Sequence, residues 1–116
     1  MGGALPTLFG LKTCDTCRKA AKSLEAGGAT VTFVDVRQSP LDVEQLTALI
    51  EAFGEALVNR RSTTWRGLTE AERQRSPLEL LRDHPTLMKR PVLQTGTTLT
   101  LGWDKDIEAR HLGTAA

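Results

Sequence analysis

The stretch LPTLFGLKTCDTC, residues 5–17, decides the fold of this 116-residue chain. Its first seven residues, Leu5–Leu11, form a short apolar run, which predicts a buried strand. A loop of two residues leads to Cys14 and Cys17, and the pattern after the first cysteine is helical. One face of the predicted helix holds Cys17, Ala20, Ala21 and Leu24. We therefore expect a strand, a loop and a helix, with a Cys-x-x-Cys pair at the helix start.

A second strand follows this helix. Gly27 and Gly28 predict the end of the helix, because glycine is common just after a helix C-terminus. The run Val31–Val36 (VTFVDV) is rich in β-branched residues and predicts a strand. The strand, helix and strand make a βαβ unit, for which a right-handed crossover is expected.

The next segments are predicted to be helical. Ser39–Asp42 (SPLD) predicts a helix start with Ser39 as the capping residue, and Gly54 predicts the end of that helix. Residues 55–90 contain helix starts and loops but no strand pattern. Thr69 with Glu72 is a candidate capping box, and Ser76-Pro77 predicts another short helix.

The C-terminal part is predicted to form a hairpin and a last helix. The β-rich runs Val92–Gln94 and Thr98–Leu101 flank a glycine, which is typical of a hairpin. Asp104 can cap a helix that runs to about Arg110. The order is β-α-β-α, a helical stretch, then β-β-α. This order predicts one α/β domain over residues 1–116, with a helical insertion at approximately 55–88.

Composition excludes several classes of protein. Hydrophobic residues make up 40% of the chain, so the composition is not that of a disordered protein, and the net charge of +1 gives no reason to expect a nucleic-acid or membrane partner. No apolar run approaches the ~20 residues that a membrane-spanning helix needs. The N-terminus lacks a signal-peptide pattern. We therefore expect a cytoplasmic protein, whose compartment keeps a Cys-x-x-Cys pair reduced.

The cysteine pair is the first candidate site. Cys14 is expected at the positive N-terminal end of a helix, which favours the nucleophilic thiolate, with Lys12 and Arg18 adding positive charge nearby. Cys17, one turn later, can resolve a mixed disulfide on Cys14. The alternative is that both are small apolar residues at a helix start. Zinc is disfavoured, because His84 and His111 lack the spacing to complete a four-ligand site, and both are expected at the surface.

Two further segments are candidates for substrate binding. Arg90 and Pro91 precede the predicted hairpin, where exposed backbone can pair with an extended substrate and Arg90 can hold an anion. The alternative for Pro91 is an ordinary proline that opens an edge strand. Residues 59–66 (NRRSTTWR) combine two arginines, hydroxyls and a tryptophan, which suits anion binding; alone, they are more typical of a solvated basic turn.

Three segments together resemble the arsenate reductase-like (ArsC) family, which includes the Spx regulators and the YffB-type reductases. They are CDTCRKA at 14–20, NRRSTTWRGL at 59–68 and KRPV at 89–92. The resemblance covers roughly Leu5–Leu112. It implies a thioredoxin-like, glutaredoxin-like fold: a mixed four-stranded sheet with a helical insertion before the C-terminal hairpin. It also implies that Pro91 faces the reactive cysteine, with the Arg90–Pro91 bond in the cis form.

The resemblance assigns roles to individual residues. Cys14 matches the catalytic cysteine, and Arg90 matches one of the arginines that hold an oxyanion in arsenate reductases. Arg61 is the match for the arginine of the insertion, with Arg60 one residue out of register. A further family arginine after the hairpin is absent, since Leu101–Asp104 (LGWD) occupies that region. This difference argues against efficient arsenate reduction.

The segments STTWR and LGW are most similar to the YffB-type branch. That branch implies a glutathione-dependent thiol reductase with glutathione as co-substrate, no bound cofactor or metal, glutaredoxin as a further partner, and a monomer. Cys17 departs from that branch toward the Spx pattern, in which a Cys-x-x-Cys pair is a disulfide switch in a regulator that binds RNA polymerase. The two hypotheses are thus a thiol-dependent reductase and, as the alternative, a redox-switched regulator.

Overall fold

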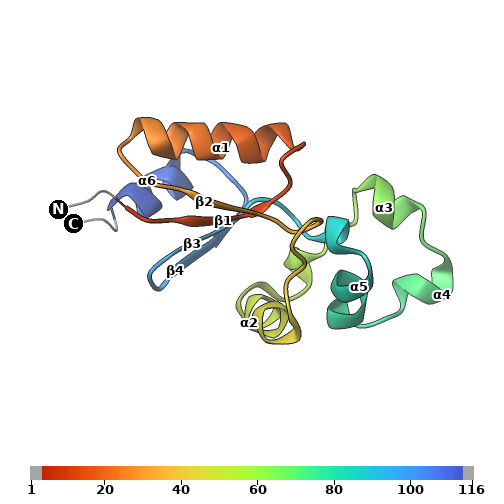
Figure 1. The fold of residues 1–116 in the computed structure, drawn as a ribbon. Coiled ribbons are helices and arrows are strands. Elements are labelled where there is room, and N and C mark those ends of the chain that lie inside the picture. Colours follow the sequence, from red (N-terminus) through yellow and green to blue (C-terminus); the bar gives the residue numbers. More distant parts are fainter. Residues whose placement is uncertain (1–3, 114–116) are drawn as a thin grey trace. The chain divides into compact units, whose positions relative to one another are not determined.

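The computed structural model describes residues 4–113 and divides into two compact units. The first unit holds the described residues up to Asp35 and those from Arg90 onward, and the second is Val36–Lys89 (Figure 1). The second unit is thus inserted in the chain between two segments of the first. The units are described in turn.

A mixed four-stranded sheet forms the centre of the first unit. Its strands, in spatial order, are β2 (Thr32–Asp35), β1 (Thr7–Gly10), β3 (Val92–Thr95) and β4 (Thr98–Leu101). Strand β1 is parallel to β2 and antiparallel to β3, and β3 and β4 form the expected hairpin. The predicted α/β fold with a four-stranded mixed sheet is confirmed. Strands β1 and β2 are shorter than the runs that predicted them, β3 extends one residue further, to Thr95, and β4 has the predicted bounds.

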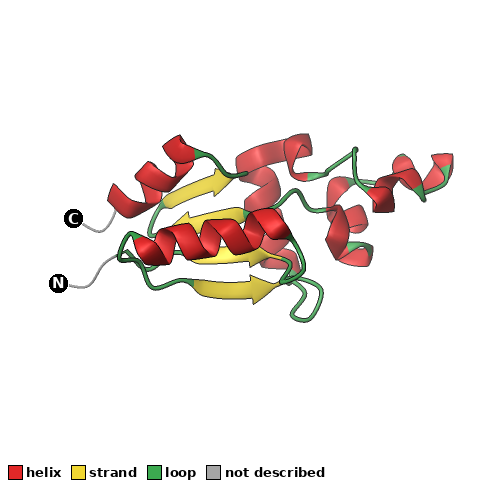
Figure 2. Cartoon of the chain, turned by 90° about the horizontal axis from the view of Figure 1, so that it is seen from above, coloured by secondary structure: helices red, strands yellow, loops and turns green. Residues whose placement is uncertain are grey.

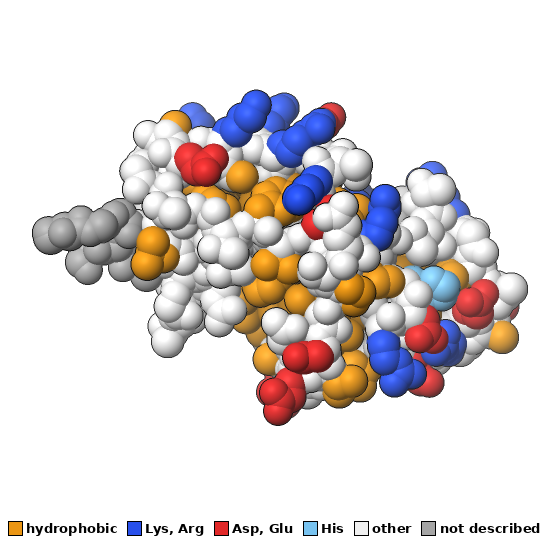
Figure 3. Space-filling view, viewed as in Figure 1, with side chains coloured by type: hydrophobic (Ala, Val, Ile, Leu, Met, Phe, Trp, Pro, Cys, Tyr) orange, Lys and Arg blue, Asp and Glu red, His pale blue; other side chains and the backbone are white. Residues whose placement is uncertain are grey.

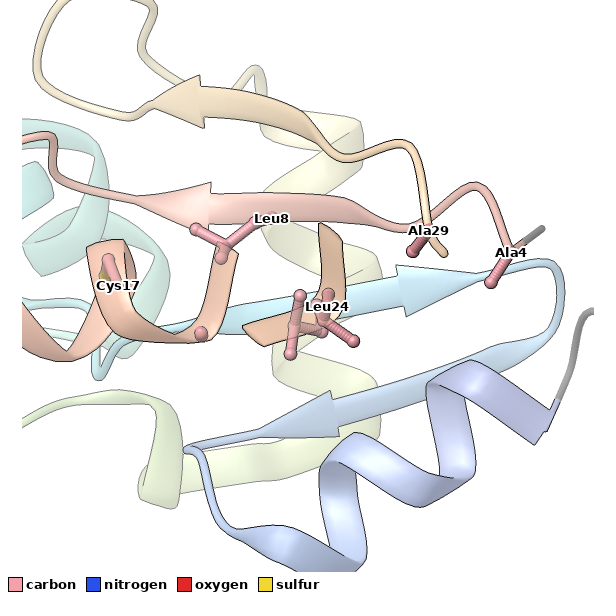
Figure 4. Close-up of a cluster of buried hydrophobic side chains, with 7 residues drawn as sticks. Ala4, Leu8, Cys17, Leu24 and Ala29 are labelled. Carbon is pink, nitrogen blue, oxygen red and sulfur yellow. The ribbon is translucent and has the colours of Figure 1, made fainter. Parts of the chain in front are cut away.

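Two helices, α1 (Asp15–Ala26) and α6 (Lys105–Gly113), pack on one face of this sheet (Figures 1 and 2). The core between them is built from small and aliphatic side chains of β1, β3 and α1. Its buried members are Ala4, Leu8, Cys17, Ala20, Leu24, Ala29 and Leu93 (Figure 4). The 3.6-residue period of α1 turns Cys17, Ala20 and Leu24 inward, as the sequence predicted. Cys17 is therefore both a core residue and a candidate site residue.

His111 lies in the core, and the expectation of a surface position was wrong. The side chain on α6 is fully buried, and its Nδ1 and Nε2 atoms lie 2.7 Å from the hydroxyls of Thr95 and Thr100. The two threonines belong to adjacent strands of the hairpin, so the imidazole ties α6 to both β3 and β4. A buried polar ring is tolerated here because both nitrogens have hydroxyl partners.

The second unit is built mainly of helices. They are α2 (Val43–Phe53), the 3-10 helix η1 (Gly54–Leu57), α3 (Thr63–Arg66), α4 (Glu70–Arg73), α5 (Pro77–Asp83) and the 3-10 helix η2 (Pro85–Leu87). The predicted capping box at Thr69 is present, and the helix start predicted at Ser76 also contains a capping box. The predicted cap of α2 at Ser39 was wrong: Asp42 caps it and accepts a hydrogen bond from Gln45 N–H at 2.8 Å. Asp42 succeeds because the residue three positions later, Gln45, completes a capping box with it.

Short contacts join the chain at the ends of η1 and η2 in the second unit. Val58 and Met88 form an isolated antiparallel bridge, and the N–H of Asn59 donates to the carbonyl of Leu87 at 2.7 Å. His84 Nε2 lies 3.5 Å from the Glu72 carboxylate, so this histidine, too, has a partner that the sequence did not reveal.

Within residues 4–113, no helix has the length and apolar character needed to cross a membrane.

Candidate active site

Cys14 occupies the N-cap of α1. Its φ and ψ of −85° and 120° are extended, its N–H donates to Leu11 O at 3.0 Å, and its carbonyl accepts the N–H of Arg18 at 3.0 Å. The turn that follows β1 therefore delivers the cysteine to the first turn of a 12-residue helix. At this position the helix presents free N–H groups and the positive end of its dipole. The half-buried sulfur thus lies where an anion is stabilised.

Three donors face the Cys14 sulfur. Partial burial favours the neutral thiol, but hydrogen bonds from the Cys17 N–H, the Cys17 thiol and the Arg90 guanidinium outweigh it and lower the pKa of Cys14. The positive charge of Arg90 acts in the same direction. The sequence expectation of a stabilised thiolate is therefore matched by specific donors in addition to the helix end.

Cys17 has the opposite electrostatic environment. Burial raises the pKa of Cys17 to about 12, and the negative Cys14 sulfur adds to this shift, although the N–H of Leu11 favours the thiolate. Both cysteines are free thiols in this structure. The pair is therefore asymmetric: the half-exposed Cys14 is the candidate nucleophile, and the buried Cys17 retains its proton and donates it in a hydrogen bond.

Arg90 and Pro91 enter the site from the segment that precedes β3. The Arg90–Pro91 peptide bond is cis, as the resemblance implied. Pro91 is fully buried, and its carbonyl accepts the N–H of Gly102, at the end of β4, at 2.8 Å. This hydrogen bond attaches the segment to the hairpin, so Arg90 is presented to Cys14 from a fixed backbone.

The two other predicted binding residues are placed differently. The side chain of Lys12 is exposed. The backbone N–H of Lys12 donates to the carboxylate of Asp35 at 2.9 Å, and this hydrogen bond holds the loop between β1 and α1. Arg61 is exposed in the second unit, where its N–H donates to Asn59 Oδ1 at 3.0 Å. The structure thus brings Cys14, Cys17 and Arg90 together, with Pro91 adjacent to Arg90 in the chain.

Residues 59–66 form a basic segment, which consists of a turn followed by α3. Arg60 forms an ion pair with Glu55 at 3.3 Å, and its guanidinium lies 5.6 Å from the centre of the Trp65 ring. Arg73 lies 5.5 Å from the same ring. Arg61 has neither contact and lines a separate hollow of about 680 Å³ with Asn59, Arg60 and Lys89 among others. The guanidinium of Arg60 is therefore held by Glu55 and Trp65, whereas that of Arg61 makes neither of these two contacts.

The exposed face of α1 next to Cys14 is basic. Arg18, Lys19 and Lys22 line a hollow of about 350 Å³ with Asp15, and Figure 3 shows Lys and Arg side chains gathered over this helix. Arg18 donates a hydrogen bond to Asp15, which offsets one of the charges. Among residues 4–113, no group of three or more His, Cys, Asp or Glu side chains could hold a metal ion.

The fold and the Cys-x-x-Cys pair at the first helix define the class: this is a small protein of thioredoxin-like fold. It belongs to the ArsC family, whose model matches residues 9–109. A relative from Haemophilus influenzae, an uncharacterized protein, is 39% identical over 109 residues, which is 89% of this chain and 96% of the relative. Spx 1 from Bacillus cereus, a global transcriptional regulator, is 26% identical over 91% of this chain and 86% of its own length.

Two solved structures cover nearly the whole chain. The YFFB protein superposes with a TM-score of 0.86 at 32% identity, over 92% of this chain and 98% of its own. An arsenate reductase (ArsC) related protein from Brucella melitensis gives a TM-score of 0.74 at 34% identity, over 96% of this chain and 97% of its own. These likenesses confirm the family and the fold that the three sequence segments implied.

Proposed function

We propose that this protein is a thiol-dependent oxidoreductase in which Cys14 is the nucleophile and glutathione is the co-substrate. The observation that carries the proposal is the set of donors from Cys17 and Arg90 around the Cys14 sulfur, at the N-terminus of α1. Such a site favours the thiolate, which is the form that attacks a disulfide or a glutathione adduct.

The chemistry runs in three steps. The Cys14 thiolate attacks one sulfur of a disulfide, forming a mixed disulfide and releasing the other half as a thiolate. Cys17, after losing its proton to solvent, then attacks the Cys14 sulfur, releases the second half and leaves a Cys14–Cys17 disulfide. Alternatively, a glutathione thiolate attacks the Cys14 sulfur and releases the second half, and a second glutathione attacks the glutathione sulfur of the resulting mixed disulfide, which frees the Cys14 thiolate and gives glutathione disulfide. Two glutathione molecules reduce a Cys14–Cys17 disulfide and leave as glutathione disulfide. Two electrons pass from glutathione to the substrate, and no metal or bound cofactor is needed.

Glutathione is supported by the charge around the site. It carries two carboxylates, and the exposed face of α1 beside Cys14 offers Arg18, Lys19 and Lys22. Opposite charges raise the rate of encounter even when each exposed ion pair contributes little to affinity. A glutaredoxin is the second candidate reductant. We propose that the protein acts as a single 116-residue domain, as a monomer in the cytoplasm, where the glutathione pool keeps both thiols reduced.

Arsenate is a less favoured substrate in this proposal. Arg90 interacts with Cys14 and can hold an oxyanion there. Arg61 is a second candidate on the family resemblance alone. The region Leu101–Asp104, where the family pattern places a further arginine, has none. With one contact fewer, the site suits a disulfide or a glutathione adduct better than an oxyanion.

A redox-switched regulator of the Spx type is the alternative function. It is favoured by the Cys-x-x-Cys pair and by the relation to Spx 1, at 26% identity. A pull-down against purified RNA polymerase, with the cysteine pair reduced and oxidised, separates the two. Capture that depends on the redox state supports the regulator, and capture in neither state supports the reductase.

The direct test of the reductase proposal is turnover of a glutathione mixed disulfide with glutathione as the reductant. We expect turnover by the wild-type protein and none by Cys14→Ser. Turnover by Cys14→Ser at the wild-type rate would contradict the proposal. Arsenate in place of the disulfide, in the same assay, decides the substrate class.

A further inference from the structure

Gly10, the last residue of β1, leaves the space that the Cys17 sulfur occupies. A Cβ atom on Gly10 would lie 2.4 Å from Cys17 Sγ, 3.3 Å from Cys17 Cβ and 3.2 Å from Leu8 Cδ2. Non-bonded contacts of a Cβ atom below 3.0 Å essentially never occur in folded proteins, so something must shift. Gly10 is not among the glycines with positive φ, which are Gly28, Gly54, Gly96 and Gly102. Glycine is therefore required at position 10 by space and not by backbone conformation.

Neither side of this contact can yield easily. On the strand side, Gly10 continues a ladder in which it pairs with Asp35 of β2, next to the pair Phe9 and Val34. On the helix side, Cys17 is fully buried on the inner face of α1 with Ala20 and Leu24 (Figure 4). Close-packed interiors transmit such an overlap as displacement or strain. A side chain at position 10 therefore displaces the Cys17 sulfur from its place beside Cys14.

We infer that Gly10 is a positioning residue for the cysteine pair: its missing side chain holds the Cys17 sulfur within reach of Cys14. The inference rests on the proposed function, because it concerns the resolving step of the same thiol exchange. Cys17 donates both its N–H and its thiol to the Cys14 sulfur. Displacement of the Cys17 sulfur removes the thiol donor and leaves the N–H and Arg90 in place.

The chemical consequence concerns the Cys14–Cys17 disulfide. In that reaction the Cys17 thiolate, its proton lost to solvent, attacks the Cys14 sulfur of a mixed disulfide with glutathione. A sulfur–sulfur bond forms between the cysteines, and the bond to glutathione breaks with release of its thiolate. The reaction requires the two sulfurs to approach bonding distance in a narrow geometry. A displaced Cys17 sulfur therefore forms the disulfide less readily, while attack by external glutathione is unaffected.

The experiment compares Gly10→Ala with Gly27→Ala. Gly27 is the matched control, because its Cβ would meet Leu112 Cδ1 at 2.7 Å, a similar overlap away from both cysteines. Each folded variant is equilibrated with glutathione and glutathione disulfide, and the oxidised fraction of the pair is measured by thiol labelling and mass spectrometry. We expect Gly10→Ala to lower the equilibrium constant for the Cys14–Cys17 disulfide by about tenfold or more. Gly27→Ala should keep the wild-type constant.

A second readout distinguishes positioning from a general loss of stability. The pH midpoint of Cys14 alkylation should rise in Gly10→Ala, because one donor to the thiolate is lost, and should be unchanged in Gly27→Ala. Wild-type values of both the constant and the midpoint in folded Gly10→Ala would overturn the inference. Neither readout involves turnover. An inactive wild-type protein with an intact Gly10 effect would therefore refute the proposed function alone.

A double-mutant comparison covers the case in which Gly10→Ala does not fold. Cys17→Ala removes the sulfur that the new Cβ would meet, so Gly10→Ala should lower the thermal midpoint less in the Cys17→Ala protein than in the wild type. Recovery of folding in the double variant supports the inference. An equal loss in both backgrounds, or a double variant that is also unfolded, overturns it, because Gly10 would then be needed for a reason unrelated to the sulfur.

Discussion

Cys17 donates hydrogen bonds to the Cys14 sulfur through both its backbone N–H and its thiol. One residue is thus the donor that stabilises the thiolate and also the candidate thiol that resolves the product. The two roles are compatible because Cys17 is buried: its pKa is raised to about 12, so it holds its proton while Cys14 is the anion. The order of events follows from this asymmetry, with Cys14 reacting first.

Replacing Cys17 tests both roles. In Cys17→Ala the pKa of Cys14 should rise, because the thiol donor is lost while the N–H at position 17 remains. Turnover with glutathione should persist at a reduced rate, because glutathione can resolve the mixed disulfide. The measurements are the pH midpoint of Cys14 alkylation and the steady-state rate. Complete loss of turnover would instead make Cys17 an obligatory resolving thiol.

Replacing Arg90 tests the contribution of its charge. Arg90→Gln keeps a donor but removes the charge that favours the thiolate, so the pKa of Cys14 should rise. Alkylation of Cys14 near neutral pH should slow accordingly. Lys105→Gln, at the exposed start of α6, is the matched control. An equal effect of both variants would mean that overall charge, and not Arg90, matters.

The buried histidine predicts a pH dependence of stability. Burial lowers the pKa of His111 below its ordinary value of about 6.5, and Arg110 acts in the same direction. Below about pH 6.5 the unfolded chain therefore binds more protons than the folded one, and the free energy of unfolding should fall as the pH is lowered. At higher pH both states carry a neutral imidazole, and this contribution to the slope disappears.

Denaturant unfolding between pH 7 and pH 5 checks this dependence. His111→Gln should flatten the slope while lowering stability by about 1–3 kcal/mol, because the hydroxyls of Thr95 and Thr100 lose their partners. A slope between pH 7 and pH 5 that is unchanged in His111→Gln would contradict the assignment.

A final prediction concerns Arg73 of α4 and its hydrogen bonds to Trp65 and Arg66 of the basic segment. Arg73 donates to the carbonyl of Trp65 through Nε at 3.3 Å and Nη2 at 3.1 Å, and to that of Arg66 at 3.3 Å. Arg73→Ala should therefore lower the free energy of unfolding by about 1–3 kcal/mol, because the charged donors to the carbonyls of half-buried Trp65 and exposed Arg66 are lost. The exposed Arg66→Ala is the control and should change stability by less than about 0.5 kcal/mol.

The fold was predictable where short-range patterns determine it. The β-branched run Val31–Val36, the glycines after α1, the capping box at Thr69 and the helix start at Ser76 each have a local physical cause. The structure contains the elements they predicted. The cap of α2 was misplaced because Ser39 and Asp42 are both good caps. The choice between them depends on Gln45, whose side chain completes the box with Asp42 alone.

Long-range relationships in the site were not predictable from spacing. His111 looked like a surface residue because its partners, Thr95 and Thr100, are 16 and 11 positions away in the chain. The role of Gly10 was missed for the same reason: the atom it accommodates belongs to Cys17, and only packing of α1 on β1 brings the two together. The roles of Cys14, Cys17 and Arg90 in catalysis, and of Lys12, Arg61 and Pro91 in binding, stay predictions.

The measurement that tests the central claim most directly is the rate of Cys14 alkylation as a function of pH in the reduced wild-type protein. Peptide mass spectrometry confirms that the label is on Cys14 and not on the buried Cys17. The account predicts a single midpoint clearly below the free-cysteine pKa of about 8.5. A midpoint at or above that value would show that the donors of Cys17 and Arg90 do not activate the thiol. It would contradict the proposal that Cys14 is the nucleophile of a reductase.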